Sequence, residues 1–396
     1  MADVPEILGT CDQRFAGVAD TLRNNFLEHG ELGAAVALVI SGEPVVDIWA
    51  GWMDDERTRP WQADTLVDVF SVGKAMATIC LLVLLERGKV ELEAPVARYW
   101  PEFAARGKDQ VTVQMMLSHQ AGLPAIRRLL ADDAMYDWDQ MSAAIAAEEP
   151  WWEPGRRHGY HVNTFGFLVG ELVRRLTGST IGKFFRSEVA GVLGADFHFG
   201  IPAQEDQRTA EYLFGEDASP AAGRAEAERL FEGDEERKLL LARVYLNPPG
   251  ISGIGTVNSR AWRAAEIPSA NGHASARGVA RIYSALACGG EVHGIRLLEP
   301  ETIGLATREA SGGVDFVLGR PSRFGLGFQL TQPERPLGPN PRSFGHFGAG
   351  GSLGFADPDE RLAFAYTLNR SGPRWQNPRN RSLVDAVYAA LGYARD

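Results

Sequence analysis

The spacing of apolar residues predicts that the chain opens with a helix and a β-hairpin. Residues 16–28 repeat apolar side chains with the period of an amphipathic helix. Residues 34–41 and 44–50 are typical of strands, and the pair Gly42-Glu43 that separates them is a hairpin signal. The pattern over the first 50 residues therefore indicates one helix followed by two paired strands.

A second helix is predicted directly after the strand-like residues 66–69. The run from Ala75 to Leu85 is apolar, and residues 79–85 are apolar on all sides. Gly88 then supplies a typical helix end. Because a helix without a polar face is a buried helix, we expect this one to lie in the centre of the molecule.

From about residue 91 to residue 276 the pattern is mostly that of helices and loops. The segment 204–243 is the most charged part of the chain, and Pro220 and Gly223 break it. We interpret this segment as an exposed helical insertion or cap. The last part of the chain is predicted to contain a helix over 277–286, strands over 324–330, 343–347, 352–356 and 362–369, and a final helix over about 381–391.

Strands at both ends with helices between them predict an α/β (α+β) fold in two parts. One domain would be built from residues 1–85 and 277–396 together, and residues 86–276 would form a mainly helical domain inserted between them. A length of 396 residues favours this division, because it exceeds the usual size of one compact domain.

Composition narrows the choice of partners and compartment. The net charge of −11 disfavours nucleic acid and anionic membranes, since both need a basic protein surface. Three cysteines far apart imply no disulfide framework, and residues 1–17 show no secretion signal. The longest apolar run falls short of the roughly 20 residues that span a bilayer. We expect a cytoplasmic protein with a small-molecule substrate, and the oligomeric state stays open, with a homodimer as one option.

Two serines lie in motifs that are typical of nucleophiles. A serine hydroxyl attacks a carbonyl group only with the help of a nearby base. Ser352 lies in Gly350-Gly351-Ser352-Leu353-Gly354, a G-x-S-x-G motif, which requires a histidine later in the chain. The last histidine is His346, before the serine. A glycine-rich turn between strands is therefore the better interpretation of Ser352.

The second candidate is Ser71, in the S-x-x-K motif Ser71-Val72-Gly73-Lys74 at the start of the buried helix. The motif alone is short enough to occur by chance. In a helix, however, Ser71 and Lys74 share one face, and Ser71 lies at the positive end of the helix dipole, which favours an alkoxide. Burial lowers the pKa of a lysine and suits it to proton transfer. We expect Ser71 to be the nucleophile and Lys74 to activate it.

Four further segments accompany Ser71-x-x-Lys74: Leu117-Ser118-His119-Gln120-Ala121-Gly122-Leu123-Pro124, Pro154-Gly155 ahead of Tyr160, Asn271-Gly272-His273, and Phe344-Gly345-His346-Phe347-Gly348-Ala349-Gly350-Gly351. In this order they resemble the serine β-lactamase-like superfamily, and most closely the family VIII carboxylesterases, which share the fold of class C β-lactamases. The resemblance runs from about residue 34 to residue 369. It implies a fold like that of β-lactamases and penicillin-binding proteins, with a central antiparallel sheet flanked by helices.

The resemblance also implies roles for individual residues. Tyr160, together with Lys74, would take the proton of Ser71 and later pass it to the leaving alcohol. Which of the two is the immediate base stays open, because coupled groups share their titration. The backbone N–H groups of Ser71 and Ala349 would form the oxyanion hole. No metal and no organic cofactor is needed for this chemistry.

Two departures from the β-lactamase pattern favour an ester over a β-lactam. In the motif Y-x-N, Val162 holds the asparagine position and Asn163 comes one residue late. In place of K-T-G stands His346-Phe347-Gly348, whose Gly348 permits close approach of the substrate. The asparagine and lysine of β-lactamases contact the acylamide and carboxylate groups of the antibiotic. Val162 has no polar group, and His346 is only partly cationic near neutral pH. We expect hydrolysis of short-chain carboxylic esters, with weak or no β-lactamase activity.

Other residues near Tyr160 have simpler interpretations. Trp151 and Trp152 come shortly before it, and Trp152 is either an apolar wall for the substrate or a packing residue. His158 and His161 have the spacing H-x-x-H, but no third ligand is near in the sequence, so we expect no metal site.

Alternative functions keep the same residues. A D-amino-acid peptidase or amidase, a β-lactamase, or an acyltransferase that uses an alcohol in place of water would share Ser71, Lys74 and Tyr160. A non-enzymatic alternative is a catalytically inactive member of the fold that binds a ligand. The presence of all three residues disfavours it, since binding alone would not require them.

Overall fold

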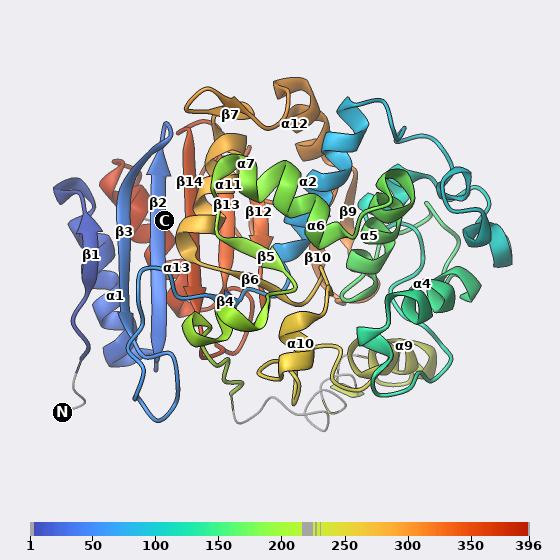
Figure 1. Ribbon diagram of the computed structural model, residues 1–396, viewed down its shortest axis with the longest axis horizontal. Helices are drawn as coiled ribbons and strands as arrows, with labels where there is room; N and C mark the ends of the chain where they lie inside the picture. Colours follow the sequence, from blue (N-terminus) through green and yellow to red (C-terminus); the bar gives the residue numbers. More distant parts are fainter. Residues whose placement is uncertain (1–3, 216–224, 226–227, 230, 395–396) are drawn as a thin grey trace.

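The computed structural model describes residues 4–215, 225, 228–229 and 231–394 (Figure 1). Within them a nine-stranded antiparallel sheet has the order β1-β3-β2-β14-β13-β12-β11-β10-β9. Strands β2 and β14 pair along their length, so the two ends of the chain meet inside one sheet. The strands of this sheet are β1 Leu8–Cys11, β2 Gly33–Ile40, β3 Glu43–Gly51, β9 Ser311–Val314, β10 Pro321–Phe324, β11 Gln329–Leu330, β12 Phe344–Phe347, β13 Leu353–Asp357 and β14 Leu362–Leu368.

Two small sheets complete the described strands. In the first, β4 (Val67–Asp68) and β5 (Phe197–Phe199) pair on either side of β6 (Gly272–Ala274). In the second, β7 (Glu291–Val292) pairs with β8 (Ile295–Arg296). The first of them matters for function, because β4 ends just before Ser71.

Helices cover both faces of the main sheet, as Figure 1 shows. Helix α11 packs on β14, β2 and β13 on one face, and α1 and α13 pack together on the other. Helix α2 lies between strand β12 and helices α5 and α6, where the sheet meets the helical part of the molecule. The described helices are α1 Ala16–Glu28, α2 Val72–Glu86, α3 Val113–Leu117, α4 Trp138–Ala147, α5 Thr164–Thr177, α6 Ile181–Phe185, α7 Gly191–Leu193, α9 Glu235–Leu246, α10 Arg260–Ala264, α11 Ala276–Ala287, α12 Pro300–Thr307 and α13 Pro378–Ala390.

The predicted fold class is confirmed: an antiparallel sheet is flanked by helices, with strands contributed by both ends of the chain. Helix α1 has the predicted bounds, and β2 and β3 form the predicted hairpin. All side chains of α2 from Val72 to Leu84 are buried, as its lack of a polar face indicated. The division into two domains, at residues 85/86 and 276/277, stays a prediction.

The single strand predicted over residues 324–330 is wrong. The chain reverses there, and β10 and β11 pair as a tight antiparallel turn with Phe324 opposite Gln329. Gly327, in the left-handed conformation at φ 68°, allows the reversal, and a Cβ atom there would lie 1.8 Å from the Thr78 hydroxyl oxygen. Strand β9, Ser311–Val314, was not predicted, because two of its four residues are glycines with low strand propensity.

The charged segment 204–243 is only partly described. It contains all but the first residue of a short 3₁₀ helix, Ala203–Arg208, and most of α9. The predicted breaks at Pro220 and Gly223 lie outside the described residues. Among the helices that the structure does describe, none has the length and apolar character needed to cross a membrane.

Loss of a large side chain from the centre of the sheet should destabilise the protein strongly. Phe364 in β14 is 0% exposed, so Phe364→Ala should lower the free energy of unfolding by about 3–5 kcal/mol in urea denaturation. The control is Leu129→Ala, because Leu129 is 68% exposed and its loss should change stability by less than about 0.5 kcal/mol. Equal losses in the two variants would contradict the position of β14 in the core.

Candidate active site

Ser71 lies at the end of a tightly held turn, directly before α2. It is the N-cap residue of this helix, but its side chain forms no capping hydrogen bond, and its hydroxyl group donates instead to the Ser269 carbonyl oxygen at 3.4 Å. Phe70 adopts the left-handed conformation at φ 48°, which is unfavourable for a bulky residue. The Phe70 N–H donates to Asp68 Oδ1 at 2.7 Å, and Trp262 Nε1 donates to Asp68 Oδ2 at 2.8 Å. The buried Asp68 carboxyl group therefore holds the turn that presents Ser71.

The Lys74 amine lies beside the Ser71 hydroxyl group and is removed from water. Lys74 is 0% exposed, and its Nζ lies 2.9 Å from Ser71 Oγ and 2.9 Å from the Ser269 carbonyl oxygen. Burial holds the pKa of Lys74 well below its ordinary value, which favours the neutral amine. A neutral amine donates to the Ser269 carbonyl and still offers its lone pair to the hydroxyl proton of Ser71.

The Tyr160 ring closes the other side of Lys74. Lys74 Nζ lies 4.9 Å from the ring centroid, and Tyr160 is 0% exposed. Burial raises the pKa of Tyr160 well above its ordinary value, and a hydrogen bond with the Ser71 hydroxyl opposes this shift only in part. Tyr160 is therefore a neutral phenol, and the phenolate form is disfavoured.

His346 contacts the hydroxyl group of Tyr160. Its Nε2 atom lies 3.4 Å from the Tyr160 hydroxyl oxygen, and its Nδ1 atom lies 2.7 Å from the Phe347 carbonyl oxygen. Because a carbonyl only accepts, Nδ1 carries the proton and Nε2 accepts from Tyr160. Burial lowers the pKa of His346 to about 3. His346 is thus uncharged near neutral pH, which goes further than the partial charge inferred from the sequence.

Gly348 brings the segment after β12 against the strand that precedes Ser71. A Cβ atom at Gly348 would lie 2.3 Å from the Val69 carbonyl oxygen, so only glycine fits this approach. Ala349 follows, with its carbonyl oxygen held by the Tyr212 hydroxyl group at 3.0 Å. Among the described residues, none accepts a hydrogen bond from the N–H of Ser71 or of Ala349. Two free N–H groups are what an oxyanion hole provides.

Asp315, which the sequence did not single out, fixes the backbone of Tyr160. Its carboxyl group is completely buried, and both oxygens lie 3.1 Å from the Tyr160 nitrogen. It also accepts from the N–H groups of Val317 and Leu318 at 2.9 Å and from the Ser322 hydroxyl at 2.9 Å. Hydrogen bonds to residues two and three positions later are typical of aspartate in a turn. The contact with Tyr160, 155 residues away, had no signal in the sequence.

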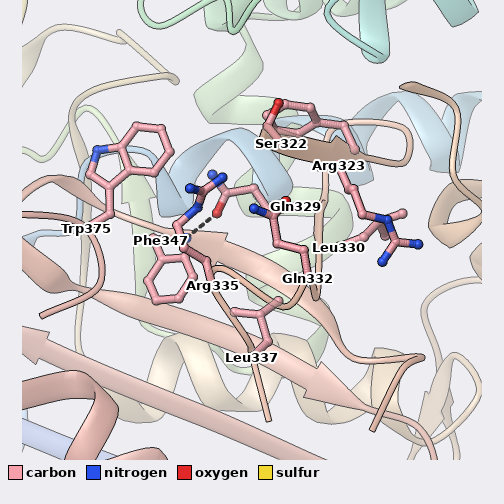
Figure 2. A pocket seen from close by; sticks show the side chains of 10 residues that line it. Ser322, Arg323, Gln329, Leu330, Gln332, Arg335, Leu337, Phe347 and Trp375 are labelled. Carbon is pink, nitrogen blue, oxygen red and sulfur yellow. Dashed lines mark hydrogen bonds between the residues drawn. The ribbon is translucent and has the colours of Figure 1, made fainter. Parts of the chain in front are cut away.

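The residues that we expected to contact the substrate lie in two different places. Phe347 lines a small cavity with Trp375, and this cavity is the one drawn in Figure 2. Val162 is partly buried against a second apolar cluster that contains Trp152. The Trp152 ring packs on His161, at 5.9 Å between ring centroids. The roles of Val162 and Trp152 toward a substrate stay predictions.

Asn163 is not available as a replacement for the missing asparagine of Y-x-N. Its amide nitrogen donates to the Val244 carbonyl at 2.8 Å and to Ser252 Oγ at 3.2 Å. Both amide hydrogens are therefore used to hold α9 and the segment that follows it.

The histidines around the site form structural hydrogen bonds. His158 Nε2 lies 2.8 Å from Ser322 Oγ, and His161 Nε2 accepts from the Leu123 N–H at 2.9 Å. Over the described ranges of the chain, no group of three or more His, Cys, Asp or Glu side chains is placed to hold a metal ion.

Comparison with known proteins agrees with this geometry. The family model described as Beta-lactamase matches residues 13–389. The chain belongs to this family. It is 38% identical over 376 residues to "Esterase/beta-lactamase LipL" of Mycobacterium tuberculosis, which covers 92% of this chain and 83% of the relative. The family resemblance seen in the motifs is therefore confirmed.

Two solved structures extend the similarity to three dimensions. A structure described as a family VIII carboxylesterase has a TM-score of 0.89 and 41% identity, and the match covers 98% of this chain and all of the other. A penicillin-binding protein homologue from Caulobacter crescentus has a TM-score of 0.87 and 37% identity, over 98% of this chain and 100% of that one. The fold predicted from the resemblance is the fold observed.

Asp315→Ala should unfold more easily, because it leaves several buried N–H groups without an acceptor. We expect a loss of about 3 kcal/mol or more in urea denaturation. Asp315→Asn keeps the shape, so it should stay folded but react with a fluorophosphonate at Ser71 roughly ten to a hundred times more slowly, because Tyr160 shifts. The control is Asp359→Asn, because Asp359 forms a surface ion pair with Arg342. This variant should neither lose stability nor slow the labelling of Ser71. Unchanged labelling in Asp315→Asn would contradict the role of Asp315 in placing Tyr160.

Proposed function

We propose that this protein is a serine carboxylesterase that hydrolyses short-chain carboxylic esters through an acyl-enzyme on Ser71. The observation that carries the proposal is the buried Lys74 amine, 2.9 Å from the Ser71 hydroxyl oxygen and with a pKa well below that of an ordinary lysine. The relatives support it, since one is named an esterase/β-lactamase and the structure at 41% identity a family VIII carboxylesterase.

In the proposed first half-reaction, neutral Lys74 is the immediate base. It takes the proton of Ser71 while Ser71 Oγ forms a bond to the ester carbonyl carbon. The N–H groups of Ser71 and Ala349 hold the negative charge that develops on the carbonyl oxygen. The bond to the alcohol oxygen then breaks, and Tyr160 donates a proton to that oxygen and recovers one from Lys74.

The second half-reaction repeats these steps with water. Lys74 and Tyr160 accept the proton of a water molecule that attacks the acyl-enzyme, and Ser71 leaves with a proton returned by the same pair. Tyr160 suits this relay as a neutral hydroxyl group, because its raised pKa keeps the proton on its oxygen when no acceptor is present. No metal ion and no organic cofactor takes part in the proposed mechanism.

The surroundings of Ser71 favour an ester over a β-lactam in this proposal. His346 is uncharged, so it supplies no positive charge for a carboxylate close to the reacting carbonyl group. The amide of Asn163 is engaged within the protein and Val162 has no polar group, so neither replaces the contact to an acylamide. We further propose a cytoplasmic setting without nucleic-acid or membrane partners, consistent with the acidic composition and with three unpaired thiols.

Removal of the nucleophile should abolish ester hydrolysis. Ser71→Ala should lower kcat/KM for 4-nitrophenyl butyrate by about 10³-fold or more, and wild type should turn over nitrocefin weakly or not at all. Ser352→Ala is the matched control, because Ser352 lies in the other serine motif and is fully buried. Full activity of Ser71→Ala would overturn the proposed function.

The low pKa of Lys74 should appear in the pH profile. Because the base must be deprotonated, kcat/KM for 4-nitrophenyl butyrate should rise with pH and level off well below the ordinary lysine pKa of about 10.4. The raised pKa of Tyr160 should keep the plateau from falling until strongly alkaline pH. Lys74→Met should lose activity about 10²–10⁴-fold at all pH values. A rise that begins only near pH 10 would show that Lys74 is not the base.

A further inference from the structure

Two arginines beside the active site have no acidic partner. The Arg320 side chain forms no hydrogen bond and no ion pair with any described residue, and its guanidinium carbon lies 5.0 Å from the centroid of the Trp375 ring. Arg335 donates a hydrogen bond to the Pro321 carbonyl oxygen and pairs with no carboxylate among the described residues. Neither guanidinium group therefore contacts a carboxylate directly within the described part of the chain.

Trp375 connects these arginines to the catalytic residues. Its ring meets the Tyr160 ring edge-on, at 5.2 Å between centroids. Figure 2 shows the Arg335 guanidinium group turned toward Trp375 and Gln329, whereas that of Arg323 points away from them. The cavity between these side chains measures about 10 Å³, which is room for one water-sized group.

The turn that holds Tyr160 also presents Arg320. Asp315 accepts the Tyr160 N–H, and the Asp315 N–H donates to the Arg320 carbonyl at 3.0 Å, so one turn fixes both residues. The oxygens of Asp315 are occupied by the N–H and hydroxyl donors of its own turn and of Tyr160. The charge of Asp315 favours the charged form of Arg320, but the two side chains form no ion pair, so the Arg320 guanidinium group has no carboxylate in direct contact among the described residues.

Burial and the charge of a neighbouring arginine disfavour the charged forms of Arg320 and Arg335. Burial is the main cause that lowers the pKa of Arg320, and the neighbouring Arg374 lowers it further, whereas Tyr245 and Asp315 oppose the shift only in part. Burial and then Arg320 lower the pKa of Arg335 to about 10. Glu334, the acidic residue next to Arg335, is exposed and forms no ion pair with it in the part of the chain that the structure describes. Charges that are destabilised and unpaired near a reactive centre are typical of a binding site for the opposite charge.

We propose that Arg320 and Arg335 form an anion subsite beside Trp375, and that the preferred ester carries a carboxylate at the end of a chain, away from its ester carbonyl group. This inference rests on the proposed esterase function. One aromatic ring separates Arg320 from Tyr160, so the carboxylate cannot lie next to the reacting carbonyl. The small cavity, which Arg335 and Trp375 line and Arg320 does not, admits a terminal carboxylate oxygen and excludes a bulkier group. Guanidinium groups suit such a ligand because they bind carboxylates with two parallel hydrogen bonds.

Paired substrates that differ by one carboxylate group test the subsite. Mono-4-nitrophenyl adipate and 4-nitrophenyl hexanoate place or omit a carboxylate on the acyl half. The acetate esters of 4-hydroxyphenylacetate and of 4-methylphenol do so on the alcohol half. Wild type should have the higher kcat/KM for the anionic member of at least one pair, and added salt should remove this preference by screening. The pair that shows the preference identifies the half of the substrate that the subsite holds.

Substitutions distinguish a role of the two arginines in binding the anion from a role in the structure alone. Arg320→Gln and Arg335→Gln should each lower kcat/KM for the preferred anionic ester about tenfold, mainly through KM, and leave its neutral partner within about twofold. Arg323→Gln is the matched control, since Arg323 lines the same cavity but points away and pairs with Glu309 at 2.8 Å. This variant should leave kcat/KM unchanged for both the anionic and the neutral ester.

Two results would contradict the proposal of an anion subsite. One is a wild type that hydrolyses both neutral esters but prefers neither anionic ester. The other is an equal loss for the anionic and neutral members in Arg320→Gln and Arg335→Gln. Failure of the esterase proposal looks different, because then neither neutral ester is hydrolysed in a manner that depends on Ser71.

Discussion

The removal of one lysine amine from water is the constraint around which the site is arranged. An ammonium ion with no exposed surface and no acidic partner would cost several kcal/mol, so Lys74 is held neutral. Its surroundings keep other positive charge away, because burial also lowers the pKa values of His119, His161 and His346. The residues next to Ser71 are therefore uncharged, and the positive charge of Arg320 and Arg335 lies one ring further out.

Three separate parts of the chain around this amine are each fixed by a buried polar side chain. Asp68 holds the turn before Ser71, and Asp315 holds the backbone of Tyr160. The Ser269 hydroxyl accepts the Gly166 N–H at 2.6 Å while the Ser269 carbonyl faces Lys74. None of these anchors needs to touch a substrate. They set the distances on which proton transfer depends.

The sequence predicted the elements that have strong local patterns, and it predicted less where distant segments meet. Helix α2 and the β2–β3 hairpin followed from apolar spacing alone. Ser71, Lys74 and Tyr160 were found through motif order, because each motif is a short local signal. The contact of Asp315 with Tyr160 and the stacking of Arg320 on Trp375 depend on tertiary packing, and no local pattern marks them. The same holds for the neutrality of His346, which only its burial determines.

The pairing of β2 with β14 also has a consequence for biosynthesis. During translation the nucleophile helix is made early, but β2 acquires its neighbour on one side only when residues 362–368 have emerged. His346 and Ala349 also come late, and a buried contact between Glu31 and Arg379, at 2.9 Å, joins the first and last helical regions. A ribosome-bound chain therefore holds Ser71 without its complete surroundings. The active site around Ser71 can therefore be completed only after almost the whole polypeptide has emerged from the ribosome.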